Sequence, residues 1–160
     1  MTIEVPIMFL YLVQHGEAKR EEEDPARGLT EKGSADVHKV AQFVQNKNLS
    51  PSQVFHSNKT RAIQTARIFA EHLKPAQGVS EAEYLAPLDD PKIWANRIAG
   101  MTEDIMLVGH LPFMARMASL LLCGEKEKPF IDFKMGGIVC LRKSDDGRWF
   151  IQWSIVPEIV

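Results

Sequence analysis

A near-continuous apolar run at residues 7–13 (IMFLYLV) constrains the fold of this chain more than any other feature. It has the length of one strand, and an unbroken apolar run of this kind suits a strand that is covered on both faces. It is too short to cross a membrane as a helix, which takes about 20 apolar residues. We therefore expect a central, buried strand in a sheet with helices on both sides.

Helical and strand patterns alternate along the rest of the chain. Thr30 can cap a helix whose apolar positions recur at three- and four-residue steps, and Asp90 followed by Pro91 is a good start for a short helix that Gly100 ends. The other predicted elements are strands at 53–55 and 105–108, helices at 58–73 and 113–122, and a hairpin of strands 138–141 and 149–156. This order predicts a three-layer αβα sandwich with a mostly parallel central sheet and an antiparallel edge hairpin.

The bulk composition is that of one ordinary globular domain spanning residues 1–160, with 45% hydrophobic and 25% charged residues. A formal net charge of -2 gives no field that recruits nucleic acid or an anionic membrane. Glu4 precedes the apolar run where a signal peptide would carry basic residues, so we expect a cytoplasmic protein. Cys123 and Cys140 stand in unrelated contexts, which predicts two reduced, mostly buried thiols.

Polar residues gather directly after three of the predicted strands. They are Gln14 and His15 after the first strand, His56, Ser57 and the nearby Arg61 after the second, and Gly109 and His110 after the third. In open α/β sheets, ligands bind in a crevice outside the carboxyl ends of the strands. Helix N-termini at this edge offer free N–H groups and a positive dipole end. The imidazoles of His15 and His110 and the guanidinium of Arg61 there predict a site for a small oxyanion.

These segments resemble the histidine phosphatase superfamily, also called phosphoglycerate-mutase-like proteins. The resemblance rests on residues 12–18 (LVQHGEA), 56–66 (HSNKTRAIQTA) and 108–110 (VGH), which occur in the right order, and it covers nearly the whole chain. The short length and the segment 29–33 (LTEKG) are most similar to the SixA type, the small phosphohistidine phosphatases.

The resemblance implies a cofactor-independent phosphatase that passes through a covalent phosphohistidine. It makes His15 the nucleophile, Arg61 the clamp on the phosphate oxygens and His110 a second stabilising group. These residue types suit the chemistry, because imidazole is neutral and nucleophilic near pH 7 and guanidinium binds phosphate through charge-assisted hydrogen bonds. Phosphoryl transfer needs mainly positioning and charge neutralisation, so we expect no metal or other cofactor.

The chain departs from the family at Gln14, since the family normally has arginine directly before the nucleophile. An amide can donate a hydrogen bond to a phosphate oxygen but brings no charge. The sequence offers four possible sources of the missing charge, which are Lys19, Arg20, Arg27 and Lys59. A catalytically weakened module that binds phosphorylated partners is therefore an alternative function.

The acid that protonates the leaving group is left open between Glu17 and Glu83, with Asp89 and Asp90 behind them. An imidazole leaving group, with a pKa of about 6.5, departs after ready protonation, whereas an alkoxide needs a strong acid. Region 73–105 contains one predicted short helix and offers little material for a lid. Both points favour phosphohistidine on another protein, such as a phosphotransfer domain, with small phosphate esters as the alternative substrates.

The polar residues also allow other roles. A metal-dependent hydrolase built on His15, His56 and His110 is a third hypothesis, which their spacing does not favour because it matches no common ligand motif. Ser57 is interpreted as a helix cap or loop hydrogen-bonder, because no Gly-x-Ser-x-Gly elbow surrounds it. His38 lies on a predicted helix and is interpreted as structural.

Overall fold

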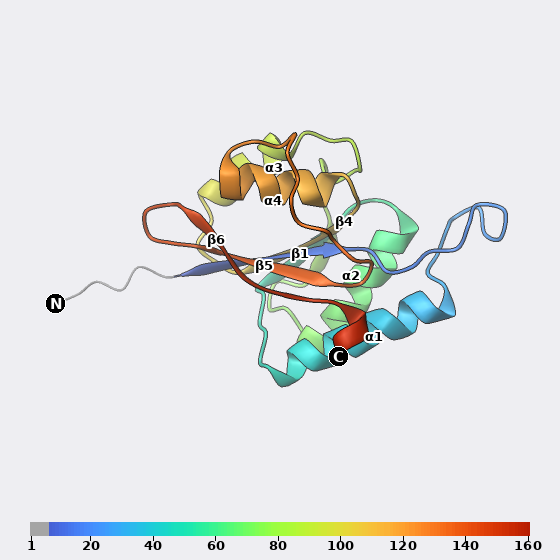
Figure 1. The fold of residues 1–160 in the computed structure, drawn as a ribbon. Helices are drawn as coiled ribbons and strands as arrows, with labels where there is room; N and C mark the ends of the chain where they lie inside the picture. The colour runs from blue at the N-terminus through green and yellow to red at the C-terminus, as the bar shows by residue number, and fades with distance from the viewer. Residues whose placement is uncertain (1–6) are drawn as a thin grey trace.

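The computed structural model describes residues 7–160 (Figure 1). Its elements are β1 (Met8–Gln14), α1 (Glu31–Asn46), β2 (Gln53–His56), α2 (Thr60–Leu73), β3 (Val79–Glu81), α3 (Pro91–Ala99), β4 (Ile105–Gly109), α4 (Phe113–Cys123), β5 (Ile138–Lys143), β6 (Trp149–Ile155) and a short 3₁₀ helix, η1 (Pro157–Ile159). Glu4, which carried the argument about a signal peptide, lies outside the described residues. In the described part of the chain, no helix is long and apolar enough to cross a membrane.

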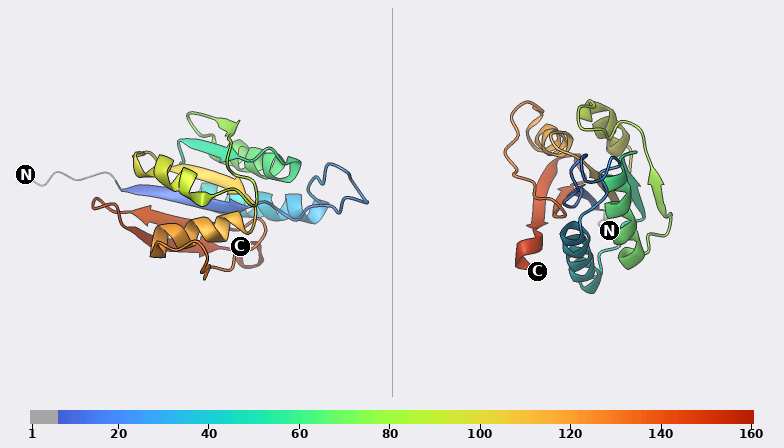
Figure 2. Two further views of the ribbon diagram at one scale, coloured as in Figure 1. Left: turned by 90° about the horizontal axis from the view of Figure 1, so that it is seen from above. Right: turned by 90° about the vertical axis from the view of Figure 1, so that its right-hand side faces the viewer.

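All six strands belong to one mixed sheet in the order β3-β2-β4-β1-β5-β6. Strands β1 to β4 are joined by parallel pairings, while β5 pairs antiparallel with both β1 and β6. Helices α1 and α2 cover one face of the sheet, and α3 and α4 cover the other (Figures 1 and 2). The predicted three-layer sandwich with an antiparallel edge hairpin is thus confirmed.

Strand β1 lies inside the sheet because its side chains are apolar on both faces. Tyr11 and Val13 pack into the core beneath α1 and α2, whereas Leu10 and Leu12 pack into the core beneath α3 and α4. Successive side chains of a strand point to opposite faces, so a strand covered on both sides needs an unbroken apolar run. Burying each such side chain stabilises the fold by roughly 1.5–3 kcal/mol.

The strand register brings the polar strand ends to one level. Gln14 of β1 lies opposite Gly109 of β4, and His56 of β2 lies opposite Val108 of β4. The backbone N–H of His15 continues the ladder by donating to the Gly109 carbonyl at 2.9 Å. Residues far apart in sequence therefore meet at the carboxyl edge of the three strands.

Two sequence predictions need correction. Strand β3 was missed, because its three residues include no apolar run and its parallel pairing with β2 defines it.

The prediction of two buried thiols was wrong for Cys123, which is exposed as the last residue of α4, next to a left-handed Gly124. Cys140 is buried in the core, and this burial raises the pKa of its thiol to about 12.

Candidate active site

His15 and His110 lie against each other at the carboxyl edge of β1 and β4. Their ring centroids are 5.1 Å apart and the ring planes are inclined by 52°. His15 is 9% exposed and His110 is 1% exposed. The ends of β1 and β4 therefore bring both imidazoles together, as the sequence predicted.

The tautomer of His15 follows from its neighbour. Its Nδ1 lies 2.7 Å from the carbonyl oxygen of Gly16, and a carbonyl oxygen can only accept a hydrogen bond. In the neutral ring, Nδ1 therefore carries the proton and Nε2 keeps the lone pair. Burial, with further contributions from the charges of Arg61 and Arg27, lowers the pKa of His15 to about 4, so the ring is neutral near pH 7.

His110 is held from its other side by Ser57. The Ser57 hydroxyl lies 2.6 Å from Nε2 of His110, whereas Nδ1 is buried and has no hydrogen-bond partner among the described residues. Burial comes first among the causes that lower the pKa of His110 to about 3, followed by the charges of His15 and Arg61. His110 is therefore also neutral near pH 7.

Arg61 stands in the first turn of α2, where the sequence placed it. Its Nε is buried without a hydrogen-bond partner in residues 7–160, and within these residues it forms no ion pair with a surface acid. Burial, and then the charge of Arg27, lowers the pKa of Arg61. Arg61 thus holds its charge beside both imidazoles without a carboxylate to neutralise it.

Arg27 reaches the same site from the loop that follows β1. It has a left-handed backbone with φ of 52°, and its Nε donates to the Lys19 carbonyl at 3.1 Å. The Asp24 carboxylate holds this turn by accepting hydrogen bonds from the N–H groups of Ala26 at 3.0 Å and Gly28 at 2.9 Å. A non-glycine residue in this conformation costs of order 1 kcal/mol and persists only where its surroundings hold it.

The structure distinguishes the four candidates for the charge missing at Gln14. Arg27 is close enough to contribute, after burial, to the lowered pKa values of both imidazoles and of Arg61. Lys59 acts in the same way on His110 alone. Arg20 instead pairs with Glu23 on the surface at 2.8 Å. The charge of Lys19 acts on the surface turn at Asp24, where it adds to the two backbone hydrogen bonds that lower the pKa of that carboxyl group.

Buried polar atoms without partners converge on this site. Three of them, Gln14 Oε1, Arg61 Nε and His110 Nδ1, belong to residues that the sequence had predicted for the site. Buried polar groups in folded proteins are nearly always paired, with protein, water or ligand. The unpaired Arg61 Nε–H and the unpaired His110 Nδ1, beside two neutral imidazoles, suit the binding of a small anion, whereas Gln14 Oε1 is an acceptor and contributes no donor.

Helix α2 also anchors the loops that carry His15 and Arg27. Thr65 accepts a hydrogen bond from the N–H of Gly16 at 3.0 Å, and Gln64 Oε1 accepts one from the N–H of Leu29 at 2.7 Å. In the sequence, Gln64 and Thr65 stood out only as part of the family resemblance. A buried threonine four residues after Arg61 was the available signal of a structural hydrogen bond.

The four candidate acids lie in different places. Glu17 accepts a hydrogen bond from the Thr30 hydroxyl at 2.9 Å, and Asp90 caps α3 by accepting from Lys92 N–H at 3.0 Å. No hydrogen bond joins Glu17 to the two imidazoles in the part of the chain that the structure describes.

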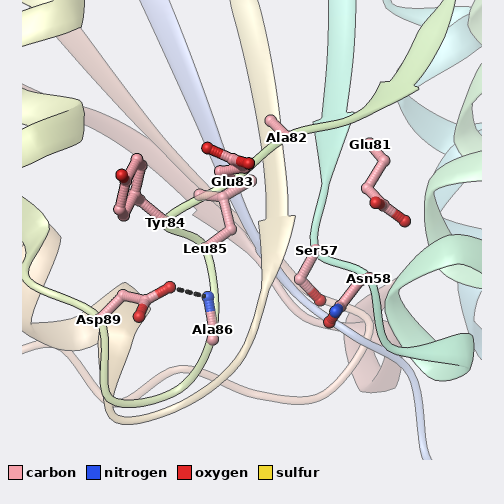
Figure 3. A pocket seen from close by; sticks show the side chains of 9 residues that line it. All are labelled: Ser57, Asn58, Glu81, Ala82, Glu83, Tyr84, Leu85, Ala86 and Asp89. Atoms are coloured by element: carbon pink, nitrogen blue, oxygen red, sulfur yellow. Dashed lines mark hydrogen bonds between the residues drawn. The ribbon is translucent and has the colours of Figure 1, made fainter.

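Glu83 and Asp89 line a pocket of about 380 Å³ that also includes Ser57 and Asn58 (Figure 3). Asp89 stabilises the pocket wall by accepting from the N–H of Ala86 at 2.9 Å. Because Ser57 contacts His110, this pocket adjoins the imidazole site. Segment 82–89 after β3 therefore contributes more to the site than the sequence predicted.

A metal centre finds no support among the described residues. No group of three or more histidine, cysteine, aspartate or glutamate residues within 7–160 is placed to hold a metal ion. Nδ1 of His56, one of the three ligands of the metal hypothesis, donates a hydrogen bond to the Ser57 carbonyl oxygen at 2.8 Å. His56 is 7% exposed, and its ring forms this hydrogen bond with the backbone of the next residue.

The fold and the site together define a phosphoglycerate-mutase-like α/β sandwich, in which parallel strand ends gather two imidazoles beside a guanidinium. Residues 10–88 match the model of the histidine phosphatase superfamily (branch 1). The chain is thus similar to the histidine phosphatase superfamily over 79 of its 160 residues.

Solved structures share this fold over most of the chain. The protein histidine phosphatase SixA in complex with tungstate has a TM-score of 0.83 and 21% identity, covering 94% of this chain and 97% of that one. The SixA protein of Agrobacterium tumefaciens gives 0.76 and 23%, covering 93% and 97%. A phosphoserine phosphatase mutant from Entamoeba histolytica in complex with phosphoserine gives 0.66 and 16%, covering 92% and 96%. No curated protein matches the chain in sequence.

Proposed function

We propose that this protein is a phosphatase that hydrolyses phosphohistidine carried on another protein, with His15 as the nucleophile. The observation that carries the proposal is the orientation of His15, whose Nδ1 is engaged by the Gly16 carbonyl so that Nε2 keeps its lone pair. A neutral imidazole with a defined lone pair is a competent nucleophile near pH 7. The tungstate-bound SixA structure supports this assignment, because tungstate is a tetrahedral oxyanion like phosphate.

The proposed reaction has two steps. Nε2 of His15 attacks phosphorus, the N–P bond of the substrate breaks, and the departing imidazole keeps the bonding electron pair and takes up a proton. Water then attacks the phosphohistidine, His15 leaves with its lone pair restored, and inorganic phosphate is released. Protonation of the first leaving group needs only a weak acid, because imidazole has a pKa of about 6.5.

The charges of the site suit a phosphoryl dianion. Arg61 and Arg27 supply two positive charges, while burial keeps His15 and His110 neutral by lowering the pKa of each ring well below 7. Arginine at such a position stabilises the charge on the equatorial oxygens of the transferring group. Arg27 thereby replaces the charge that Gln14 lacks, which favours a catalyst over a module that only binds phosphorylated partners.

A second candidate function, hydrolysis of small phosphate esters, is favoured by the pocket beside Ser57. Its carboxyl groups include Glu83 and Asp89, which are candidates for protonating an alkoxide leaving group. Of the two candidate functions, phosphohistidine hydrolysis makes the smaller demand on such an acid. Neither activity requires a membrane or nucleic acid. The cytoplasmic location of the protein remains a prediction.

The test is a labelling experiment on metal-free protein. The protein is incubated with a phosphotransfer domain carrying ³²P-phosphohistidine or with a phosphate ester, and is quenched under alkaline conditions that preserve phosphohistidine. We expect label on His15 and release of phosphate from the phosphotransfer domain. His15→Ala abolishes both, while His38→Ala, a histidine outside the site, changes neither.

Three other outcomes would point elsewhere. Unchanged turnover in His15→Ala would remove the nucleophile. Turnover of the ester alone would assign the protein to small substrates. Binding of the phosphorylated domain without release of phosphate would indicate a phospho-ligand-binding module.

A further inference from the structure

Ser57 lies between β2 and His110 and is 2% exposed. Its backbone N–H donates to the Val108 carbonyl of β4 at 3.3 Å, so the sheet fixes its position. Its hydroxyl lies 2.6 Å from His110 Nε2 and accepts a hydrogen bond from the Lys59 N–H at 3.3 Å. These contacts form a buried chain from the start of α2 to the second imidazole.

The donors and acceptors of Ser57 and His110 indicate which atom donates in the hydrogen bond between them. A serine hydroxyl has one donor and two acceptor lone pairs, and a neutral imidazole has one donor and one acceptor. The Lys59 N–H occupies one lone pair of Ser57. Among the described residues, the acceptor in reach of the Ser57 proton is Nε2 of His110.

The opposite arrangement has two costs. If Nε2 carried the proton and donated to Ser57, the buried hydroxyl would have no acceptor within the described residues. The second nitrogen, Nδ1, would then present a lone pair to an incoming phosphoryl oxygen. A buried, unpaired polar group costs roughly 1–3 kcal/mol, so this arrangement is disfavoured.

We infer that Ser57 is a positioning residue that holds neutral His110 in its Nδ1–H tautomer, so that Nδ1 donates a hydrogen bond to the transferring phosphoryl group. This inference rests on the proposed function. It explains why His110 Nδ1 is buried and unpaired beside the His15 ring. No proton is transferred at His110, which stays neutral through both steps.

The two imidazoles then have the same tautomer and opposite roles. In His15, the Gly16 carbonyl holds the proton on Nδ1 and leaves the Nε2 lone pair for attack. In His110, Ser57 engages the Nε2 lone pair and leaves the Nδ1 proton for donation. One ring supplies electrons to phosphorus and the other supplies a hydrogen bond to oxygen.

The test measures the tautomer directly. Protein labelled with ¹⁵N-histidine is studied by long-range ¹H–¹⁵N NMR, with His110 assigned by its absence in His110→Gln. We expect the Nδ1–H pattern in the native protein, and a shift toward the Nε2–H tautomer in Ser57→Ala. Ser57→Thr, which keeps the hydroxyl, restores the native pattern.

Binding of vanadate, a phosphoryl mimic, links the tautomer to the site. We expect Ser57→Ala to weaken vanadate binding at least about tenfold, as for the loss of a hydrogen bond to a charged group, and Ser57→Thr to recover most of it. Thermal unfolding of both variants shows that the fold is kept. With a substrate, Ser57→Ala lowers kcat more than it raises KM.

Two results would overturn the inference. One is an unchanged Nδ1–H tautomer in Ser57→Ala, and the other is a changed tautomer with unchanged vanadate binding. Failure of the proposed function is seen separately, as the absence of label on His15 in the native protein, because the NMR measurement requires no turnover.

Discussion

The Thr65 hydroxyl accepts a hydrogen bond from the backbone N–H of Gly16 at 3.0 Å and donates one to the Arg61 carbonyl at 2.8 Å. One buried side chain of α2 therefore links the residue after His15 to the turn that carries Arg61. The proposed nucleophile and the proposed phosphate clamp are held in register by this contact, although they lie 46 positions apart in sequence.

Replacing Thr65 with valine tests this link, because valine has the same shape without the hydroxyl. The Gly16 N–H would lose its acceptor, so we expect the free energy of unfolding in urea to fall by about 1–3 kcal/mol. The rate of His15 labelling should fall as well. Thr65→Ser keeps the hydroxyl and serves as the matched control; equal losses in both variants would assign the effect to packing.

The stability of the protein at acidic pH tests whether His15 and His110 are buried in their neutral form. The pKa of His15 is about 4 and that of His110 about 3 in the folded protein, against 6.5 for an exposed imidazole. Above pH 6.5 neither state binds these protons, and their neutral burial costs no stability. As pH falls from 6.5 toward the folded pKa values, the unfolded chain binds protons that the folded protein does not, so stability falls by up to about 1.4 kcal/mol per pH unit for each ring.

This pH dependence is measured by urea unfolding between pH 7 and pH 5. His110→Gln removes one of the titrating groups and should flatten the slope, whereas His38→Ala, which lies outside the site, should leave it steep. A slope that is the same in His110→Gln and the native protein would contradict neutral burial of this ring.

The sequence predicted that the residues of the candidate site lie together because its signals are local. The apolar run that ends at Val13 sets the centre of the sheet, and the carboxyl ends of neighbouring parallel strands must meet at one edge. His15 and His110 directly follow such strands, so their proximity could be predicted without knowing how the loops fold. Their roles were supplied by family resemblance and remain proposals.

Other parts of the site depend on tertiary contacts that leave no local signal. Arg27 reaches the site because Asp24 holds its turn and its backbone is left-handed, neither of which follows from residue type. The contact of Ser57 with His110 depends on the register between β2 and β4. Strand β3 is defined by its pairing with β2, so its short, largely polar sequence does not indicate a strand.

Replacing the arginine side chains of the site tests whether Arg27 supplies the positive charge that Gln14 lacks. We expect Arg27→Ala to weaken vanadate binding about tenfold to 100-fold, because hydrogen bonds to charged groups contribute about 1.5–3 kcal/mol. Adding Gln14→Arg to this variant restores a second guanidinium and should recover part of the affinity. Arg20→Ala removes an exposed arginine and should have no effect.

Calorimetric titration with vanadate measures these affinities. Full affinity in Arg27→Ala would show that this guanidinium does not contact the anion. No recovery in the double variant would show that position 14 does not face the bound group.

Gly33 in the first turn of α1 packs against the backbone of the loop that carries His15. A Cβ atom on Gly33 would clash with the carbonyl oxygen of Glu17, which also accepts a hydrogen bond from the Thr30 N–H at 3.0 Å. Gly33→Ala gains about 1 kcal/mol of helix propensity but forces backbone apart, and overpacking of this kind typically costs about 1–3 kcal/mol. We therefore expect a net loss of stability in urea unfolding and a slower rate of His15 labelling. Gly100→Ala, where the nearest atom is 4.0 Å away, is the matched control with little expected change, and a more stable Gly33→Ala variant would rule out the close approach of α1 to this loop.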